Sequence, residues 1–413
     1  MSPSDLAKPT IDSRRIASID VLRGLAMLGI LVLNIQIFAM PFEAYGNPFA
    51  FGDLEGSNYW VFTLSMVLAD MKFMAIFSML FGAGMVLFIE RLLETGRPAY
   101  AIHYRRMAWL LVIGFIHAYL IWYGDILVGY ALCGMILVWC RRLPPWLLFF
   151  GGLGLLAVSS IIMLGSGGLM MKFAPEKIAA AAIGSADMQE SIQWQLDSYR
   201  GGWTDQLSHR IMTSSIMQTM GFLFFIFWRA GGLMLIGMAL YRWGVFSARR
   251  SNGFYLGLLA LGVLVGLPLC LLGVQAGWSV DWNPIKVKFM TGQLNYWGSI
   301  FVAWGWVALI MLLVRSGMLQ WLQYGLVSVG RMALSNYLLQ SILCTLIFYG
   351  HGLGLFGTWD RTEQMLLVLV VTIGQLIWSP LWLGAFRFGP AEWLWRTLTY
   401  WQLQPMRRTS TTG

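Results

Sequence analysis

Residues 21–40 read VLRGLAMLGILVLNIQIFAM, an almost unbroken run of apolar side chains. A transmembrane α-helix needs about 20 such residues, whereas a membrane β-strand alternates polar and apolar residues over about ten. Comparable runs recur at residues 73–90, 107–123, 126–140, 146–165, 219–241, 254–274, 296–314, 332–350 and 364–385. The sequence therefore predicts an all-α fold, a polytopic membrane helix bundle with about ten transmembrane helices.

The composition excludes a water-soluble protein. Hydrophobic residues make up 58% of the 413 residues and charged residues only 11%, whereas about 25% charged is usual in soluble domains. The 21 Trp, 15 Tyr and 25 Phe residues also exclude a disordered chain. The net charge of +9 is scattered between apolar runs and forms no basic stripe. We therefore expect a lipid bilayer as the environment and no nucleic-acid partner.

The basic residues between the apolar runs predict the orientation, because loops rich in Lys and Arg stay in the cytoplasm. If the N-terminus is inside, most of the 28 Lys and Arg residues fall on inside segments. These inside residues are Lys8, Arg14, Arg15, Arg91, Arg97, Arg105, Arg106, Arg141, Arg142, Arg242, Arg249, Arg250, Arg315, Arg331, Arg387, Arg396, Arg407 and Arg408. We expect both termini to be cytoplasmic.

The predicted spans divide the chain into five segments. They are a cytoplasmic tail (1–20), an N-terminal membrane half (21–165), an outside loop (166–218), a C-terminal membrane half (219–400) and a cytoplasmic tail (401–413). The outside loop is long for a helix bundle, so it either covers a site or is a spacer, and its middle predicts one or two short surface helices. Residues 58–70 are too short to span alone and predict a re-entrant or interfacial helix that leads into the second span. The first apolar run lacks a cleavage site and is expected to remain as a span.

The metal-ligating residue types show no metal-binding pattern. The four cysteines, at positions 133, 140, 270 and 344, lie in or at the ends of apolar runs without a CxxC pair. His103, His209 and His351 have no metal-ligand spacing. We expect buried free thiols and no metal site.

Polar residues in the first span suggest a site near its cytoplasmic end. Asp20 and Arg23 are three residues apart, so they share a helix face and can form an ion pair. Arg23 could instead bind an anion, such as a lipid phosphate, at this mouth of the bundle. Asn34 lies about three turns deeper, where a polar side chain needs a partner.

His117 is expected in the outer half of the third span, and Asp125 follows eight residues later at the outer turn. Eight residues correspond to about 12 Å along a helix, so contact requires the turn at Tyr123 and Gly124 to fold Asp125 back. His117 would then be a general base or acyl acceptor, oriented by a carboxylate. The structural alternative, which the sequence alone favours, is a neutral histidine bonded to a neighbouring helix.

Two further polar features lie at membrane depth. Arg229 is near the midplane of its span and must meet a carboxylate, carbonyl groups or an anion; Asp70 and Asp125 are the expected partners. In the ninth span the residues Asn336, Tyr337, Gln340 and Ser341 form a polar stripe. Such stripes more often hold helices together than line a cavity.

Three segments together resemble one family of bacterial membrane proteins. RIASIDVLRGLAMLGILVLNI (15–35), RRMAWLLVIGFIHAYLIWYGDILVGYAL (105–132) and GRMALSNYLLQSILCTLIFYGHGLGLFG (330–357) occur in order, and the resemblance to the YeiB family covers about residues 14 to 400. The opening motif also resembles the SxDxxRG sequence of heparan-alpha-glucosaminide N-acetyltransferase and its bacterial relatives.

The resemblance implies an acyltransferase-like core in the bacterial inner membrane, with acyl-coenzyme A as a co-substrate entering from the cytoplasm. Residues that match the wider acyltransferase pattern are Asp20, Arg23, Gly24, Asn34, Asp70, Asn336 and Tyr337. His117 and Asp125 match the YeiB pattern only. The acetyltransferases carry a reactive histidine in the outside loop after the first span, but residues 41–56 here, PFEAYGNPFAFGDLEG, contain none.

The acyltransferase hypothesis assigns a role to each group of residues. His117 is the base, Asp125 orients it, and Arg105, Arg106, Arg331 and Arg23 contact the donor phosphates at the inner surface. The acceptor would be an exported sugar or a lipid headgroup. The alternatives are a transporter of a small anionic or amphipathic solute, with Arg229 as its binding charge, and a non-catalytic membrane partner. Association into a homo-oligomer is left open.

Overall fold

The computed structural model describes residues 16–180 and 184–408. The regular secondary structure of this part is helical, apart from one isolated bridge between Phe386 and Arg407. The predicted all-α class is therefore confirmed. In chain order the helices are α1 (Ala17–Ala39), α2 (Glu43–Gly46), α3 (Ser57–Leu68), α4 (Lys72–Glu94), α5 (Ala99–Ile116), η3 (His117–Ile121), α6 (Leu127–Leu137), η4 (Val138–Arg142), α7 (Pro145–Phe173), α8 (Pro175–Ala180), α9 (Ala186–Arg200), α10 (Leu207–Ile216), η5 (Met217–Ile226), α11 (Phe227–Arg242), α12 (Asn252–Leu261), η6 (Gly262–Gly266), α13 (Leu267–Trp278), α14 (Pro284–Lys286), η7 (Val287–Thr291), α15 (Gly292–Ser316), α16 (Gln320–Arg331), α17 (Ala333–Phe348), α18 (Arg361–Ala385) and α19 (Pro390–Tyr400).

Among the described residues, seven helical segments are long and apolar enough to cross a membrane, or eight if the bent pair α16 and α17 counts as one. The predicted number of ten is not confirmed. The predicted spans 107–123 and 126–140 fall in α5 with η3 and in α6 with η4, which are not among these segments. Most of the segment 58–70 lies in helix α3, which leads into α4, and the two together form one candidate span, Ser57–Glu94.

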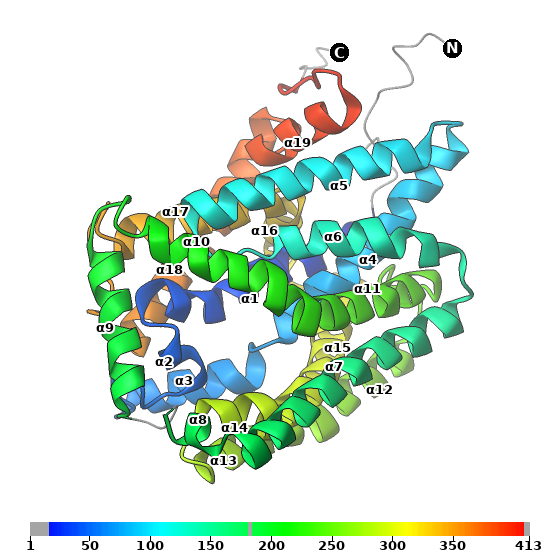
Figure 1. Cartoon of the computed structure of the whole chain (residues 1–413). Coiled ribbons are helices and arrows are strands. Elements are labelled where there is room, and N and C mark those ends of the chain that lie inside the picture. Colours follow the sequence, from blue (N-terminus) through cyan, green and yellow to red (C-terminus); the bar gives the residue numbers. More distant parts are fainter. Residues whose placement is uncertain (1–15, 181–183, 409–413) are drawn as a thin grey trace.

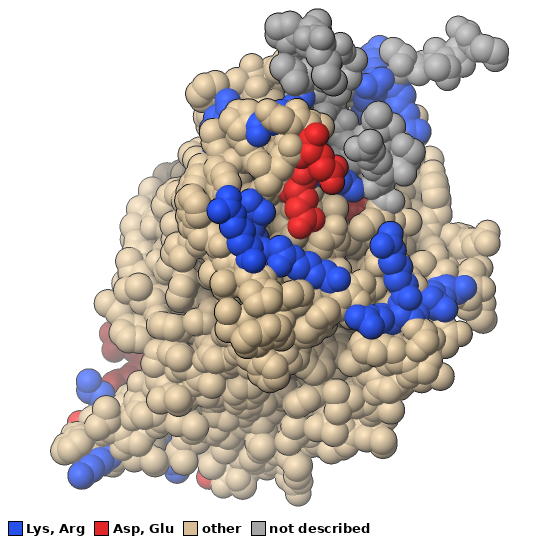
Figure 2. All heavy atoms as spheres, turned by 90° about the vertical axis from the view of Figure 1, so that its right-hand side faces the viewer, with Lys and Arg blue, Asp and Glu red and all other residues tan. Residues whose placement is uncertain are grey.

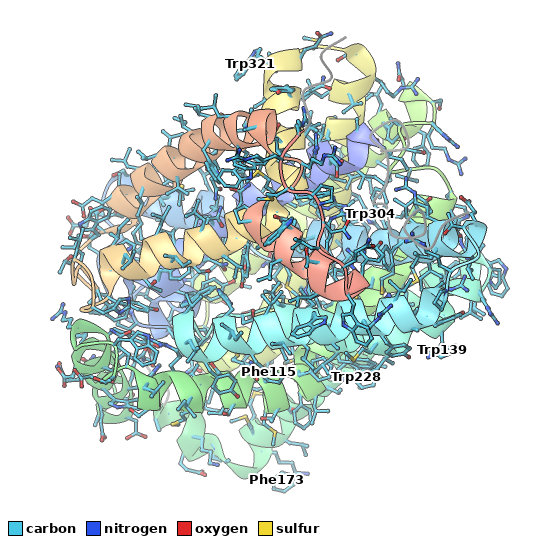
Figure 3. All side chains as sticks on the ribbon, turned by 90° about the horizontal axis from the view of Figure 1, so that it is seen from above. Phe115, Trp139, Phe173, Trp228, Trp304 and Trp321 are labelled. Carbon is cyan, nitrogen blue, oxygen red and sulfur yellow. The ribbon has the colours of Figure 1, made fainter. Side chains whose placement is uncertain are left out.

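The surface of the bundle is strongly apolar. Trp321, Phe173 and Trp139 are exposed by 72%, 70% and 58%, and all three lie at the periphery of the molecule when it is seen from above (Figure 3). Exposed apolar patches of this kind mark contact with a membrane or with other proteins. Together with the candidate spans, this supports a multi-pass membrane protein.

Helix α1 packs closely against α16, and two glycines allow the approach. A Cβ atom on Gly24 would lie 2.0 Å from the carbonyl oxygen of Leu326, and one on Gly330 would lie 2.0 Å from that of Asp20. Small residues at such contacts let helix backbones approach each other in a membrane. This packing fixes the N-terminal end of α1, which carries Asp20 and Arg23.

Two candidate spans are interrupted. Between α3 and α4 the chain passes through Met71 with φ of 63°, a left-handed conformation that is unusual for a residue other than glycine. Between α16 and α17 the axis bends by 83°. Glu392 of α19 closes the start of α17, because its Oε1 atom accepts hydrogen bonds from the backbone N–H groups of Leu334 and Ser335 at 2.6 and 3.1 Å.

The middle of the segment 166–218 contains the short helices α8 and α9, where the sequence predicts one or two, and α10 follows them. In Figure 1, α9 stands across the left-hand end of the bundle beside α2. Its Ser191 and Gln195 side chains donate hydrogen bonds to the Glu43 carboxylate at 2.6 and 2.7 Å. Helix α10 continues through η5 into α11, so this helical run begins at Leu207 and not at 219. Residues 181–183 of the predicted loop lie outside the described residues.

Candidate functional site

His117 begins a π-helical turn at the end of α5. The N–H group of Trp122 bonds to the His117 carbonyl at 2.8 Å, whereas an α-helix would direct it to Ala118. The carbonyl of Ala118 is thereby released and accepts a hydrogen bond from Ser214 Oγ of α10 at 2.9 Å. Such π-turns are frequent at functional sites, and this one sets the position of the His117 ring.

The segment that follows the π-turn brings Asp125 back onto His117. Asp125 Oδ1 lies 2.9 Å from His117 Nδ1, and its Oδ2 accepts a hydrogen bond from the N–H group of Val128 at 2.8 Å. The second bond satisfies an orphan donor in the first turn of α6. The fold-back of the turn that the sequence required for contact is therefore present.

The other ring nitrogen of His117 meets a serine. His117 Nε2 lies 2.9 Å from Ser341 Oγ of α17. His117 is 0% exposed and Ser341 is 1% exposed. When Asp125 is ionised and His117 is neutral, the ring carries its proton on Nδ1; Nε2 is then an acceptor for the Ser341 hydroxyl. A hydroxyl, an imidazole and a carboxylate stand in the order of a Ser-His-Asp triad.

The sequence predicted no catalytic role for Ser341, although this residue belongs to the polar stripe of the ninth predicted span. The stripe has two faces in the structure. Tyr337 and Ser341, four residues apart, face His117, and the Tyr337 ring centroid is 4.9 Å from that of His117. The sequence shows the four-residue spacing of Tyr337 and Ser341. It does not show that His117, 224 residues before Ser341, is their partner.

Asn336 and Gln340 occupy the other face and bond to α18. Asn336 Nδ2 donates to Ser379 Oγ at 3.0 Å, and Gln340 Nε2 donates to Gln375 Oε1 at 2.9 Å. Gln375 Nε2 returns a bond to the Asn336 carbonyl at 3.0 Å. These two residues hold α17 against α18, so on this face the stripe joins two helices. Asn34 is half-buried on α1 and joins neither face.

Arg229 does not pair with either expected carboxylate. It is fully buried and donates to the Tyr296 carbonyl at 3.2 Å and to Ser299 Oγ at 2.7 Å. Its guanidinium lies 4.3 Å from the Tyr296 ring centroid, and its Nε atom has no hydrogen-bond acceptor among the described residues. The expectation that Asp70 or Asp125 would pair with Arg229 is therefore wrong, because other groups bind both carboxylates.

Asp70 lies at the break between α3 and α4 and belongs to a separate cluster. Its carboxylate accepts hydrogen bonds from Tyr45 Oη at 2.5 Å and Asn295 Nδ2 at 2.6 Å. Lys72, which is fully buried, donates to Asn295 Oδ1 at 2.6 Å and to the Met66 carbonyl at 2.7 Å. The Asn295 amide thus connects a carboxylate to an ammonium group.

Basic side chains gather on the face that is predicted to be cytoplasmic, as the upper half of the view in Figure 2 shows. Arg23 Nη1 pairs with Asp20 Oδ1 at 2.7 Å, as the three-residue spacing predicted. The Arg105 guanidinium lies 4.4 Å from the Trp401 ring. Arg331 Nη2 lies 3.5 Å from the carbonyl oxygen of Arg387.

Arg106 is held between two aromatic rings on this face. Its guanidinium is 4.4 Å from the ring centroids of both Phe88 and Trp395, and Trp395 donates a hydrogen bond to the Arg106 carbonyl at 2.8 Å. Burial, followed by the charge of Arg396, lowers the pKa of Arg106 to about 10. Arg106 therefore keeps its positive charge at neutral pH.

Comparison with known proteins places the chain in a family. It is 35% identical to the "Uncharacterized protein YeiB" of Escherichia coli (strain K12), over 93% of this chain and 96% of that protein. This chain belongs to the YeiB family. It is also 30% identical to the "Uncharacterized protein YxaH" of Bacillus subtilis (strain 168), over 97% and 98% of the two chains. A family model described as "Protein of unknown function (DUF418)" matches residues 240–402.

In this YeiB-family chain most of the site residues that the sequence predicts fall into three polar groups. The first is Ser341, His117 and Asp125, which has the order needed for proton transfer and nucleophilic attack. The second is the buried cluster of Asp70, Tyr45, Asn295 and Lys72. Arg229 is not part of this cluster and bonds to Tyr296 and Ser299. The third is the basic face that is predicted to be cytoplasmic. No group of three or more His, Cys, Asp or Glu side chains in residues 16–180 and 184–408 has the arrangement of a metal site.

Proposed function

We propose that the chain is a membrane acyltransferase that moves an acyl group from cytoplasmic acyl-coenzyme A to an extracytoplasmic or lipid acceptor. The observation that carries the proposal is the His117 ring, held between the Asp125 carboxylate at 2.9 Å and the Ser341 hydroxyl at 2.9 Å. Acyl transfer needs a base that removes a proton from a hydroxyl or amine as it attacks a carbonyl. The resemblance of the opening motif to membrane acetyltransferases supports the same reaction class.

His117 would act as the base and Asp125 as its positioning residue. The carboxylate fixes the tautomer and stabilises the imidazolium that forms when Nε2 accepts a proton. Because Asp125 also bonds to Val128 at the start of α6, the carboxylate has little freedom to rotate away. The helix α10 covers the π-turn through Ser214 and Arg210, whose Nη1 atom donates to the Leu120 carbonyl at 2.9 Å. This cover would exclude water from the acyl group.

The donor would bind at the cytoplasmic face. Arg105, Arg106 and Arg331 lie on the segments expected inside, and Arg23 lies at the end of the first span that is expected to be cytoplasmic. Guanidinium groups bind phosphates through paired N–H donors. Trp401 is 73% exposed beside Arg105 and offers an aromatic plane on which an adenine ring could stack. The Arg106 guanidinium already contacts the rings of Phe88 and Trp395. We therefore expect Arg106 to attract the donor phosphates by its charge and not by a direct hydrogen bond.

Binding of the donor tests this part of the proposal. Purified protein in lipid nanodiscs is incubated with millimolar acetyl-coenzyme A, and a density map is calculated at the cytoplasmic face. We expect donor density against Arg105 and Trp401, and the same binding in His117→Gln, since this residue acts on the acyl group only. Absence of binding at millimolar donor, together with absence of any labelled product from labelled acetyl-coenzyme A, would contradict the proposal.

A second candidate function is transport of a small anionic solute. It is favoured by Arg229, which is buried at a predicted membrane midplane and has no carboxylate partner among the described residues. The break at Met71 also lies in a candidate span, as in transporters whose helices are interrupted at the substrate site. Solute flux into proteoliposomes that survives His117→Ala and disappears in Arg229→Gln would favour transport. Neutral behaviour of both variants in every assay would favour a non-catalytic membrane partner.

A further inference from the structure

We infer that Ser341 is the nucleophile of the site and carries the acyl group as a covalent ester before the acceptor receives it. The inference rests on the proposed acyltransferase function and adds to it a two-step mechanism. Its first support is that both nitrogens of the His117 ring are occupied, Nδ1 by Asp125 and Nε2 by Ser341. An acceptor hydroxyl could reach Nε2 only after displacing Ser341. The hydroxyl group that His117 can deprotonate in this arrangement is that of Ser341.

The direction of the hydrogen bond agrees with this role. When Asp125 is ionised it can only accept, and a neutral His117 then donates through Nδ1 and accepts through Nε2. The Ser341 hydroxyl then has to donate, and its proton points at the base. The alternative acceptor for this proton, the Tyr337 carbonyl, is 3.3 Å from Oγ, compared with 2.9 Å for His117 Nε2. The shorter contact is the one that activates the serine.

The position of Ser341 on α17 suits a group that receives an acyl chain from the cytoplasmic side. Ser341 lies eight residues after Ala333, the first residue of the helix, which is about 12 Å along the axis. The start of α17 is the end that Glu392 of α19 closes. The acyl group would therefore travel about two turns into the bundle, and the phosphates of the donor would remain near the basic face.

The two half-reactions balance without a further reactant. In the first, Ser341 Oγ attacks the thioester carbonyl, its proton passes to His117 Nε2, the C–S bond breaks, and the thiolate takes the proton to leave as free coenzyme A. In the second, an acceptor hydroxyl or amine attacks the ester carbonyl and gives its proton to His117. The C–O bond to Ser341 then breaks, and Oγ recovers the proton. No group is oxidised or reduced.

Burial protects such an ester. His117 and Ser341 are at most 1% exposed, and the site is surrounded by the rings of Tyr337 and Trp122, whose centroids lie 4.9 and 6.2 Å from that of His117. Water is the competing acceptor for an acyl-serine, so its exclusion favours transfer over hydrolysis. We expect acyl-coenzyme A hydrolysis to be slow when no acceptor is present.

The test uses the full chain in nanodiscs and an exchange reaction that needs no acceptor. Unlabelled acetyl-coenzyme A is mixed with labelled coenzyme A, and the label that appears in acetyl-coenzyme A is measured. A covalent intermediate makes this exchange possible, so we expect exchange in the wild type and a loss of at least about 100-fold in Ser341→Ala. Acid quenching followed by peptide mapping should place the acetyl group on Ser341.

Two control variants distinguish failure of the covalent intermediate from failure of the acyltransferase proposal. Ser328→Ala removes another buried serine, whose Oγ bonds to the Tyr324 carbonyl at 2.9 Å, and it should retain exchange. Ser341→Cys is close in size and should keep a measurable adduct, now as a thioester. Transfer to an acceptor without exchange, or with full activity in Ser341→Ala, would overturn the covalent intermediate and leave the acyltransferase proposal standing. If the wild type binds no donor and shows neither transfer nor exchange, the acyltransferase proposal fails as well.

Discussion

His117 Nδ1 lies 2.9 Å from Asp125 Oδ1, although eight residues and the end of a helix separate the two side chains. The contact exists because the π-turn at His117–Ile121 ends α5 early and the segment up to Asp125 returns toward the ring. The same carboxylate closes the first turn of α6 through Val128. One side chain therefore links the orientation of the histidine to the local fold.

Replacement of Asp125 separates these two roles. In Asp125→Asn the amide can turn its NH₂ group toward Nδ1 and favour the wrong tautomer of His117, so we expect acyl transfer to fall by roughly 10³–10⁴-fold. The stability should change by only about 1 kcal/mol, the usual size of a lost helix-cap interaction. Turnover and thermal unfolding of the same preparation measure both effects. A large loss of stability with normal turnover of the remaining folded protein would contradict the positioning role.

The close packing of α1 against α16 predicts a matched pair of glycine variants. In Gly330→Ala the new Cβ would lie 2.0 Å from the Asp20 carbonyl oxygen, so the helices must separate, at a cost of about 1–3 kcal/mol. Gly84→Ala, in α4, has no atom within 4 Å of the new Cβ and should be neutral or slightly stabilising. Thermal unfolding in one detergent compares the two variants. Equal melting temperatures would show that α1 and α16 are not held this closely.

Arg105 offers a test of donor binding that leaves the chemical step intact. Arg105→Gln removes a charge beside Trp401, and we expect the KM for acyl-coenzyme A to rise by about tenfold while kcat changes little. Arg315→Gln is the control, because Arg315 lies at the end of α15 and bonds to Asn252 and Ala248. A rise in KM of the same size in both variants would indicate general electrostatic attraction and not a donor site at Arg105.

Glu392 predicts a pH dependence of stability. Burial raises the pKa of this carboxyl above its usual 4.5, against the lowering effect of its hydrogen bonds from Ser335 and Leu334. The folded protein therefore takes up a proton at a pH where the unfolded chain has lost it, so this contribution to stability is complete below pH 4.5 and is lost as the pH rises through the folded value. We expect the melting temperature of the wild type, relative to Glu392→Gln, to increase as the pH is lowered. A constant difference between the two proteins would contradict the raised pKa.

The orientation of the chain is open to a direct measurement. The distribution of Lys and Arg predicts that both termini are cytoplasmic. Fusions to the C-terminus should therefore be active with a reporter that works in the cytoplasm and inactive with one that requires export. The opposite pattern would reverse the assignment of the donor face and place Arg105 and Arg106 outside.

The sequence predicted features that depend on composition or on neighbouring residues. The all-α class, the Asp20–Arg23 ion pair and the short helices of segment 166–218 follow from hydrophobic runs and local spacing, and the structure has all three. The number of spans is harder to predict, because it depends on where each helix begins and ends. Helix α5 changes to a π-turn at His117, and α6 is only 11 residues long.

Contacts between distant segments were not predictable in the same way. Arg229 was expected to bind Asp70 or Asp125, but Tyr45 and Asn295 bind the first carboxylate and His117 and Val128 bind the second. Which of several neutral partners replaces a carboxylate depends on how the helices pack, and one sequence does not contain that information. The pairing of Ser341 with His117 was missed for the same reason.

The most direct test of the acyltransferase proposal is the movement of label across a sealed membrane. Proteoliposomes with the basic face outward receive labelled acetyl-coenzyme A outside and candidate sugar or lipid acceptors within. We predict that the wild type and His103→Gln, which alters a different buried histidine of α5, transfer label to an acceptor, and that His117→Gln does not. Transfer by His117→Gln at the wild-type rate, or no transfer by the wild type to any acceptor while the protein binds the donor, would contradict the account.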